Sequence, residues 1–457
     1  MGARKNLNIK LILLLIFLVI SFVSILAFMI EKCKYGLIID LEVTVLGTFF
    51  LGVLLFSKDY LNPFVIYYIY SFLGFLDIVF VIFDLRITRF IQTESIYQKT
   101  LFIMILWFFA FSLGYFILGR IQFSENKRRF IHLLDNFNLN IKITIWAIVI
   151  LMFFVLFKLV LTASSVGGLL AAFTTTGYKV FEGQNYLSML MALIGILPVL
   201  YLASGKRKSA VIATIIIFLC MSLTKRRSLA LIYSLMPILT YYNYKVSRIK
   251  AKNFLLLLIP VSVYILYIAS MRGIASGASQ SISNSILGNV VEITRQVQYG
   301  ENIPDMISAI DSGRIQLQGL NYVFNGILTF IPRGIWSDKP LVESAAIVGQ
   351  LVYGADVAGH PVGPYGWAYF CFGYIGVFVF GCINGLIVKK IFDWVKREDS
   401  LFSYLFYSLT IVKLLEIFAP ESQFKILFLT IILIVLSVFS NMFVISRNGL
   451  VKNKLSN

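Results

Sequence analysis

The stretch ILFLTIILIVLSVFSNMFVI, residues 426–445, contains twenty consecutive residues without a charged side chain. An α-helix needs roughly 20 mostly apolar residues to cross the hydrocarbon core of a bilayer, so this stretch predicts a transmembrane helix. Similar apolar runs recur along the chain, and we expect an all-α polytopic membrane protein with about twelve transmembrane helices. The candidate spans are residues 9–30, 37–56, 63–84, 100–119, 143–161, 186–204, 209–223, 228–242, 253–270, 363–388, 401–418 and 426–445.

The composition supports a membrane location. Of the 457 residues, 59% are hydrophobic and 14% are charged, and the mean hydropathy is +0.86. Soluble domains carry about 25% charged residues, so an ordinary water-soluble protein is excluded. No internal repeat or low-complexity linker divides the sequence, and residues 1–457 are expected to form a single membrane domain. The first run, Ile9–Ile30, ends without a small-residue cleavage site, which favours an uncleaved spanning helix.

The basic residues indicate the orientation of these spans. The net charge is +18, and the basic side chains gather between apolar runs, a pattern typical of membrane topology and not of nucleic-acid binding. With the N-terminus inside, the basic connections 120–142, 206–208, 245–252 and 389–397 fall on one side of the membrane. The positive-inside rule then places both termini in the cytoplasm. Residues 271–362 are expected to form one large, structured extracytoplasmic loop.

One basic cluster does not follow this rule. Lys225, Arg226 and Arg227 fall on the outer side when the spans alternate. Either the two neighbouring spans are drawn incorrectly and the cluster is a cytoplasmic anchor, or the cluster binds an anion at the outer face. In the second interpretation, Arg226 and Arg227 are candidate substrate-binding residues.

The cysteines and histidines do not indicate a metal site. The four cysteines form no CxxC pair, and His132 is expected on the side opposite to His360. The sequence also contains no phosphate-binding P-loop. We therefore expect no metal and no cofactor.

The outer loop contains elements that do not span. Pro304 followed by Asp305 predicts the start of a short helix. Residues 320–331 form an apolar run that is too short to cross a bilayer. Such a run can lie flat in the membrane interface or dip into the protein.

The same loop contains the sequence FIPRGIWSDKP, residues 330–340. Pro332 lacks a backbone donor and Gly334 permits unusual dihedral angles, so these residues predict a shaped turn. The turn carries two positive charges, a carboxylate and a flat aromatic ring. This mixture suits a pyrophosphate next to a sugar, and it makes four side chains candidate ligands of such a substrate: Arg333, Lys339, Asp338 and Trp336.

This motif resembles the F-I-P-R-x-x-W-x-D-K-P segment of the oligosaccharide repeat-unit polymerases, the Wzy-type polymerases of O-antigen and capsule assembly. With the glycine-rich, aromatic run from Gly359 to Gly376, the resemblance covers roughly the last third of the chain. Lys225-Arg226-Arg227-Ser228 partly matches a Gly-x-Arg-Ser-like element of the family. Where the family commonly has a Glu before the matching tyrosine, this chain has Gly366 and Trp367.

The resemblance implies a glycosyltransferase of the cytoplasmic membrane that works at the outer leaflet. It would join repeat units carried on undecaprenyl pyrophosphate en bloc, without a cofactor. The lipid bilayer and the lipid-linked oligosaccharide are the implied partners, with a chain-length regulator protein as a further candidate and no nucleic acid. An O-antigen-ligase-like transferase would have a similar sequence.

Arginine dominates the basic residues of the loop. Arg272, Arg295, Arg314 and Arg333 accompany a single lysine, Lys339, and a guanidinium group binds phosphate oxygens bidentately. Arg272 is expected at the end of a span and Arg333 in the proline-framed turn. We therefore expect both to hold the donor pyrophosphate as catalytic residues, while the other two arginines are interpreted as surface residues.

The general base has two candidates. His360 lies at the mouth of the span that begins near residue 363, where an imidazole can act as a base or simply as a structural hydrogen-bonding group. Glu343 flanks the 330–340 motif and offers a carboxylate instead. In the membrane, Lys413 and Glu416 share a helix face and are expected to pair.

The aromatic residues after position 363 also have two interpretations. Tyr365, Trp367, Tyr369, Phe370 and Phe372 could form an interfacial belt or a wall on which a sugar stacks. The belt is the preferred interpretation, with Tyr365 retained as a candidate substrate-binding residue. Glycines between positions 373 and 385 are expected to allow close helix packing.

A transporter or flippase of lipid-linked glycans is the alternative from another functional class. Transporters typically show structural repeats and broken helices near the bilayer midplane. Here the informative polar residues are expected at the outer face, which favours the enzyme.

Overall fold

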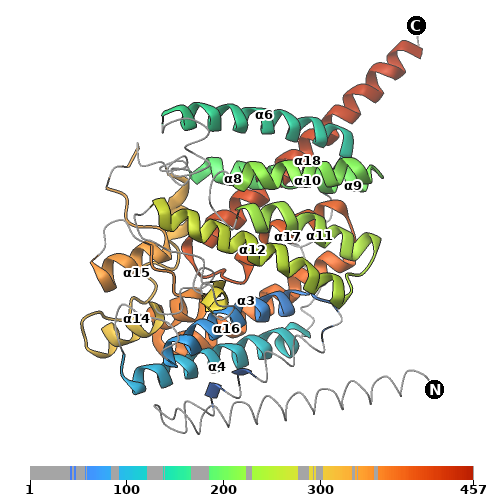
Figure 1. Ribbon diagram of the computed structural model, residues 1–457. Helices are drawn as coiled ribbons and strands as arrows, with labels where there is room; N and C mark the ends of the chain where they lie inside the picture. The colour runs from blue at the N-terminus through green and yellow to red at the C-terminus, as the bar shows by residue number, and fades with distance from the viewer. Residues whose placement is uncertain are drawn as a thin grey trace, which may run out of the picture. The chain divides into compact units, whose positions relative to one another are not determined.

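The computed structural model describes residues 42–43, 46–47, 57, 59–83, 92–120, 137, 139–165, 185–222, 229–275, 288–291, 293–294, 302–331, 335–336, 338–354 and 359–455. Within these ranges the chain forms helices and turns and no strand (Figure 1), so the predicted all-α class is confirmed there. In the part of the chain that the structure describes, five helices are long and apolar enough to cross a membrane: α3 (Pro63–Ile82), α4 (Glu94–Phe116), α6 (Ile141–Ser165), α16 (Gly363–Glu398) and α18 (Pro420–Leu455).

The structure describes eight further α-helices. They are α8 (Asn185–Ile194), α9 (Leu197–Ala203), α10 (Arg207–Ser222), α11 (Ser234–Tyr241), α12 (Ala251–Ala275), α14 (Asn302–Asp311), α15 (Ser344–Tyr353) and α17 (Leu401–Leu414). Short helical turns of other types are η1 (Leu118–Arg120), η5 (Leu229–Tyr233), η6 (Tyr242–Val246) and η7 (Asn325–Phe330). The number of twelve spans and the cytoplasmic location of both termini stay predictions, since the candidate span 9–30 lies outside the described residues.

Two of the expected spans are not single helices. The range 186–204 divides into α8 and α9 at Gly195, where a Cβ atom would lie 1.8 Å from the carbonyl oxygen of Tyr233. The range 228–242 is built from η5 and α11, with Pro237 inside α11. Proline removes one intrahelical hydrogen bond and distorts the preceding turn. An apolar run of sufficient length was therefore not enough to predict a continuous helix.

The chain divides into two compact units. The first contains residues 1–119, 285–386 and 418–421, and the second contains residues 120–284, 387–417 and 422–457. Helix α16 begins in the first unit and ends in the second.

Glycines bring α4 and α16 into close contact in the first unit. A Cβ atom on Gly114 would lie 2.1 Å from the carbonyl oxygen of Cys382, and one on Gly385 would lie 2.2 Å from that of Phe111. Aromatic rings of α3 and α4 fill the adjacent core, where the rings of Tyr67 and Phe111 stack with centroids 4.4 Å apart. The predicted glycine packing of α16 is therefore confirmed.

Helix α16 is broken near its beginning. Phe372 and Gly373 have non-helical backbone angles, and the positive φ of 62° at Gly373 is a conformation that glycine adopts readily. The break releases backbone carbonyl groups from the helix, and two of them accept hydrogen bonds from the outer loop. The amide of Gln318 donates to the carbonyl of Phe370 at 3.0 Å, and that of Gly319 donates to the carbonyl of Cys371 at 2.8 Å. The outer loop is thus held against α16.

In the second unit, ion pairs form near both ends of α17 (Leu401–Leu414). Lys245 pairs with Asp399 at 2.6 Å, and the hydroxyl of Tyr404 donates to the same carboxylate. Lys413 pairs with Glu416 at 2.9 Å, which confirms the pair expected from their spacing on one helix face. Ser400 caps α17 by a reciprocal capping box with Ser403.

Candidate functional site

The candidate site is built on α14 and α15, the two short helices of the outer loop. The short helix predicted at Pro304 is confirmed: α14 begins two residues earlier, and its Ile303, Met306 and Ile307 are buried. This apolar packing fixes the first turn of α14, so that the side chains of Asn302 and Asp305 are also buried, with exposed fractions of 3% and 6%. Buried polar groups need hydrogen-bond partners, and these two residues find theirs in other parts of the first unit.

Asp305 accepts two hydrogen bonds. Its Oδ1 accepts from Nε2 of Gln92 at 2.7 Å, and its Oδ2 accepts from the hydroxyl of Tyr353 at 2.8 Å. Gln92 precedes α4, and Tyr353 ends α15. The carboxylate of Asp305 therefore ties the two helices of the loop to the beginning of a membrane helix.

Asn302 connects this cluster to His360. Its Nδ2 donates to the carbonyl of Pro361 at 2.9 Å, while its Oδ1 lies 3.3 Å from both the hydroxyl of Tyr353 and Nδ1 of His360. The rings of Tyr353 and His360 stack, with centroids 4.0 Å apart and an angle of 26° between the planes. We call Gln92, Asn302, Asp305, Tyr353 and His360 the outer-loop polar network.

The amide of Asn302 determines the tautomer of His360. A carbonyl oxygen can only accept, so the bond to Pro361 assigns the NH₂ group of the amide to that side and its oxygen to His360. An amide oxygen also only accepts, and Nδ1 must then carry the ring proton. In the neutral imidazole, Nε2 is the basic nitrogen.

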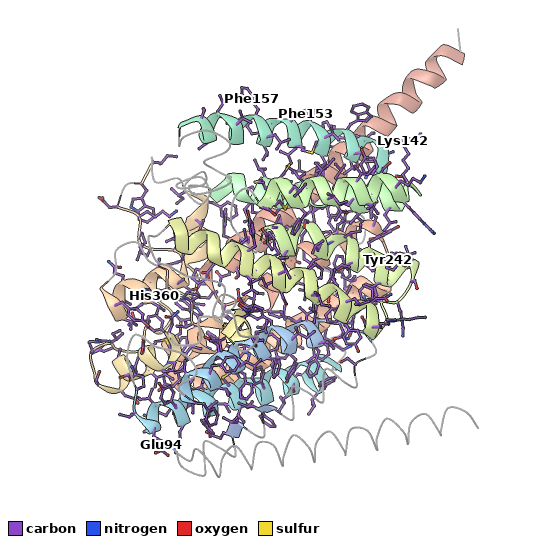
Figure 2. All side chains as sticks on the ribbon, in the orientation of Figure 1. Glu94, Lys142, Phe153, Phe157, Tyr242 and His360 are labelled. Carbon is purple, nitrogen blue, oxygen red and sulfur yellow. The ribbon has the colours of Figure 1, made fainter. Side chains whose placement is uncertain are left out.

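The backbone of His360 is held as firmly as its ring. Its amide donates to the carbonyl of Ala345 in α15 at 2.8 Å, and Figure 2 shows the labelled side chain beside this helix. A Cβ atom on the preceding residue, Gly359, would lie 3.4 Å from Cβ of Ala345, a tight contact. The imidazole contacts Asn302 through Nδ1 and stacks on Tyr353, and its Nε2 atom is buried.

The proline-framed turn is closed by a lysine. Nζ of Lys339 donates to the carbonyl of Ile331 at 2.9 Å, and the side chain of Lys339 is buried, with 8% of the residue exposed. Nδ2 of Asn325 holds the outgoing chain by donating to the carbonyl of Leu341 at 3.2 Å. Both ends of the turn that carries Arg333 are thus fixed, although Arg333 itself lies outside the described residues.

The candidate ligands of this turn have different surroundings. Trp336 and Asp338 are exposed, so both can meet a ligand. Lys339 was a candidate substrate-binding residue, but its ammonium group is directed to the carbonyl of Ile331. In this structure Lys339 holds the turn.

Glu343 is exposed and precedes α15 without capping it through its side chain. A different carboxylate takes the capping role: Glu421 accepts from the amide of Ser344 at 3.0 Å and from its hydroxyl at 2.6 Å. Glu421 lies 77 positions further along the chain, so no local pattern could indicate it.

The aromatic residues after position 363 are enclosed. Tyr365, Trp367, Tyr369 and Phe370 are at most 5% exposed, and Nε1 of Trp367 donates to the carbonyl of Phe418 at 2.9 Å. The preferred interpretation of these residues as an interfacial belt is therefore wrong, because belt residues face lipid. For Tyr365, which stays a candidate sugar-binding residue, the ring offers almost no accessible surface.

The remaining arginines are described less completely. Arg272 lies in the last turn of α12, which ends at Ala275, and its side chain is not described. Arg226, Arg227 and Arg295 lie outside the described residues, whereas Arg314 is exposed, as expected for a surface residue.

Of the five residues in the outer-loop polar network, the sequence indicates a chemical role for His360 alone, while Asp305 is marked only as part of a helix start. Gln92, Asn302 and Tyr353 come from segments far apart in the sequence and match no motif. Among the described residues, no three His, Cys, Asp or Glu side chains gather as metal ligands do.

Comparison with known proteins gives one match. A family model described as "Putative O-antigen polymerase" matches residues 62–418, a range that includes the whole outer-loop polar network and the proline-framed turn. No curated protein and no solved structure matches the chain.

Proposed function

The chain belongs to the family of O-antigen polymerases, and from this premise we propose that it joins oligosaccharide repeat units carried on undecaprenyl pyrophosphate. The family supports a polysaccharide polymerase, and the apolar helices support a multi-pass membrane protein. In our proposal the protein is a glycosyltransferase of the cytoplasmic membrane. It acts at the extracytoplasmic face, where the outer-loop polar network and the proline-framed turn form its site.

The proposed transfer makes two chemical demands on the protein. The acceptor hydroxyl oxygen forms a bond to the anomeric carbon of the donor, and the bond from that carbon to the pyrophosphate oxygen breaks. The hydroxyl proton must go to a base, and the departing pyrophosphate must be stabilised by positive charge and hydrogen-bond donors. We propose that guanidinium groups meet the second demand and that the reaction needs no metal.

Arg333 is the proposed donor to the pyrophosphate. The residues on both sides of it are held by Lys339 and Asn325, which supports a turn of defined shape. A planar guanidinium group in such a turn can bind two phosphate oxygens at once. Arg272 is proposed as a second phosphate ligand, and Arg226 with Arg227 as a further anion-binding pair. Trp336 and Asp338, both exposed, are proposed to contact the sugar.

His360 is the proposed base. Asn302 holds the proton on Nδ1, so Nε2 is the nitrogen that would take the proton of the acceptor hydroxyl. Because Nε2 is buried, the acceptor would reach it only after the segment around residues 359–362 moves. Glu343 is the alternative base, and its exposure allows direct access. The hydrogen bond from Nδ1 to Asn302, which sets a defined tautomer, is the observation that favours His360.

Incubating the purified protein with lipid-linked repeat units tests the proposed reaction. We expect a ladder of longer lipid-linked chains. Movement of the lipid between leaflets without new glycosidic bonds would instead establish a flippase. Transfer of glycan to an acceptor other than a repeat unit would establish a ligase-like enzyme.

Two variants separate the candidate bases. If His360 is the base, His360→Gln abolishes chain extension while Glu343→Gln retains it, and both proteins reach wild-type levels in the membrane. The opposite pattern would assign the base to Glu343. Full activity in both variants would exclude both residues.

A further inference from the structure

The exposure of α16 changes at its break. Before the break, Tyr365, Phe370 and Cys371 are at most 2% exposed, whereas Ile375, two residues after Gly373, is 76% exposed. Exposed apolar residues continue along the helix at Phe378 and Val379. In a candidate membrane span, such residues are expected to face lipid. Only the part of α16 after the break presents this face.

A segment of the outer loop is bound at this position. The amides of Gln318 and Gly319 donate to the carbonyls of Phe370 and Cys371, the last two residues before the break. Cδ1 of Leu317 lies 3.5 Å from the place that a Cβ atom on Gly373 would occupy. The loop segment therefore begins where the exposed face of α16 ends.

The segment carries its own row of exposed apolar side chains. Leu317, Leu320, Phe324, Ile327 and Phe330 are between 42% and 60% exposed and follow one another at intervals of three or four residues. Residues 315–331 contain no Asp, Glu, Lys or Arg. We call residues 317–331 the apolar loop segment. A water-facing loop with this composition would expose an unusually continuous apolar surface.

The backbone of the apolar loop segment is hydrogen-bonded within itself. Five of its amides donate to carbonyls three residues earlier: Asn321 to Gln318, Val323 to Leu320, Asn325 to Tyr322, Ile327 to Phe324, and Ile331 to Leu328, at 3.0 to 3.3 Å. Hydrocarbon cannot hydrogen-bond to a peptide group, so a segment that enters it must satisfy its backbone internally or against protein. In this segment five amides bond internally, and those of Gln318 and Gly319 bond to α16.

If the bilayer begins near Gly363, where the predicted span 363–388 begins, the docking point lies in the outer leaflet. Cys371 follows the first residue of α16 by eight positions, which at 1.5 Å per residue is about 12 Å along the helix. The hydrocarbon core of a bilayer is about 30 Å thick, so each leaflet contributes about 15 Å. The exposed surface is also continuous with α4, where the ring of Phe102, 46% exposed, contacts Tyr374 with centroids 5.6 Å apart.

We propose that the apolar loop segment is a membrane-embedded element whose exposed side chains bind the hydrocarbon of bilayer lipids. The outer loop then does not lie wholly in the aqueous phase, since residues 317–331 continue the lipid-facing surface of α16 beyond its break. This inference requires a membrane location and does not depend on the proposed reaction.

Site-directed spin labelling in lipid nanodiscs tests this placement. Cys33, Cys220, Cys371 and Cys382 are first replaced by alanine, and single cysteines are introduced by Leu320→Cys, Phe324→Cys and Ile327→Cys. The accessibility of each nitroxide to oxygen, which partitions into lipid, is compared with its accessibility to a water-soluble nickel chelate. Ile375→Cys is the lipid-facing control, and Ser312→Cys, at an exposed position after α14, is the water-facing control.

We expect the three labels to resemble Ile375→Cys, with oxygen accessibility exceeding that of the nickel chelate. Labels that resemble Ser312→Cys would overturn the proposal, and so would labels reached by neither reagent, because another part of the protein would then cover the segment. Phe324→Trp gives a second measurement in the protein with its native cysteines. Brominated phosphatidylcholine should quench its added fluorescence, and unchanged fluorescence would contradict the proposal.

Discussion

At the residue scale, the side-chain amide of Asn302 determines which nitrogen of His360 can act as the proposed base. Asn302 contacts both Pro361 and His360. Asn302→Leu removes the NH₂ group that donates to the carbonyl of Pro361 and the oxygen that accepts from Nδ1 of His360. Each lost hydrogen bond costs about 1 kcal/mol, and we expect kcat to fall by roughly tenfold or more, with KM nearly unchanged. Assays with purified lipid-linked substrate measure both constants. Asn321→Leu, the same substitution at an exposed position, is the matched control. A higher KM with an unchanged kcat would contradict a role in positioning the base.

The second prediction at the residue scale concerns the guanidinium group of Arg333, the proposed donor to the pyrophosphate. Loss of one donor to the departing charge costs on the order of 3 kcal/mol, or about a hundredfold in rate. Arg333→Lys should fail nearly as badly as Arg333→Ala, because lysine keeps the charge but cannot bind two oxygens with a planar fork. Chain-length distributions in cells at matched protein levels measure the effect, with Arg314→Lys as control. Wild-type polymer from Arg333→Lys would show that a point charge suffices.

At the scale of the elements, the contact between α4 and α16 depends on glycine. A Cβ atom on Gly385 would lie 2.2 Å from the carbonyl oxygen of Phe111 and 2.8 Å from the amide nitrogen of Tyr115. Gly385→Ala must therefore separate the helices, and overpacking of this kind costs about 1–3 kcal/mol. We expect a melting temperature in detergent several degrees lower than that of the wild type. Ile375→Ala, on the exposed face of α16, should leave it nearly unchanged.

The junction between α16 and α17 gives a pH-dependent prediction. Hydrogen bonds from Lys245 and Tyr404 lower the pKa of Asp399 below its ordinary value. Stability from this carboxylate is therefore fully present above the ordinary Asp value, near 3.9, and is lost as the pH falls through the lowered value of the folded protein. The wild type should be more stable than Asp399→Asn at neutral pH, and the two should converge in acid. Melting curves at several pH values check this, and a difference that persists in acid would contradict it.

At the scale of the whole molecule, the charge distribution predicts the orientation. Both termini and the connection 120–142 are expected in the cytoplasm, and the polar part of the 271–362 loop outside. In intact cells, an impermeant maleimide should label Glu343→Cys but not a cysteine introduced by Ser124→Cys. Labelling of Glu343→Cys only after lysis would reverse the orientation.

The sequence by itself determined the helical class and the membrane environment, because apolar runs of about 20 residues leave helices as the structure that satisfies the backbone in lipid. It also identified the glycine-dependent packing of α16 and the pair of Lys413 with Glu416. The turn at Pro332–Gly334 lies outside the described residues and stays a prediction. The sequence did not reveal that the helices are interrupted at Gly195 and Phe372. The residues around both positions are as apolar as those of an unbroken span.

The tertiary structure decided what the side chains of the outer loop do. Lys339 holds a backbone carbonyl, the aromatic residues after position 363 are enclosed, and Gln92, Asn302, Asp305 and Tyr353 assemble around His360. These outcomes depend on contacts between segments far apart in the sequence, such as the hydrogen bond between Gln92 and Asp305, which are 213 positions apart. Burial and hydrogen-bond partners at that separation are properties of the packed chain, and no local pattern of residue types contains them.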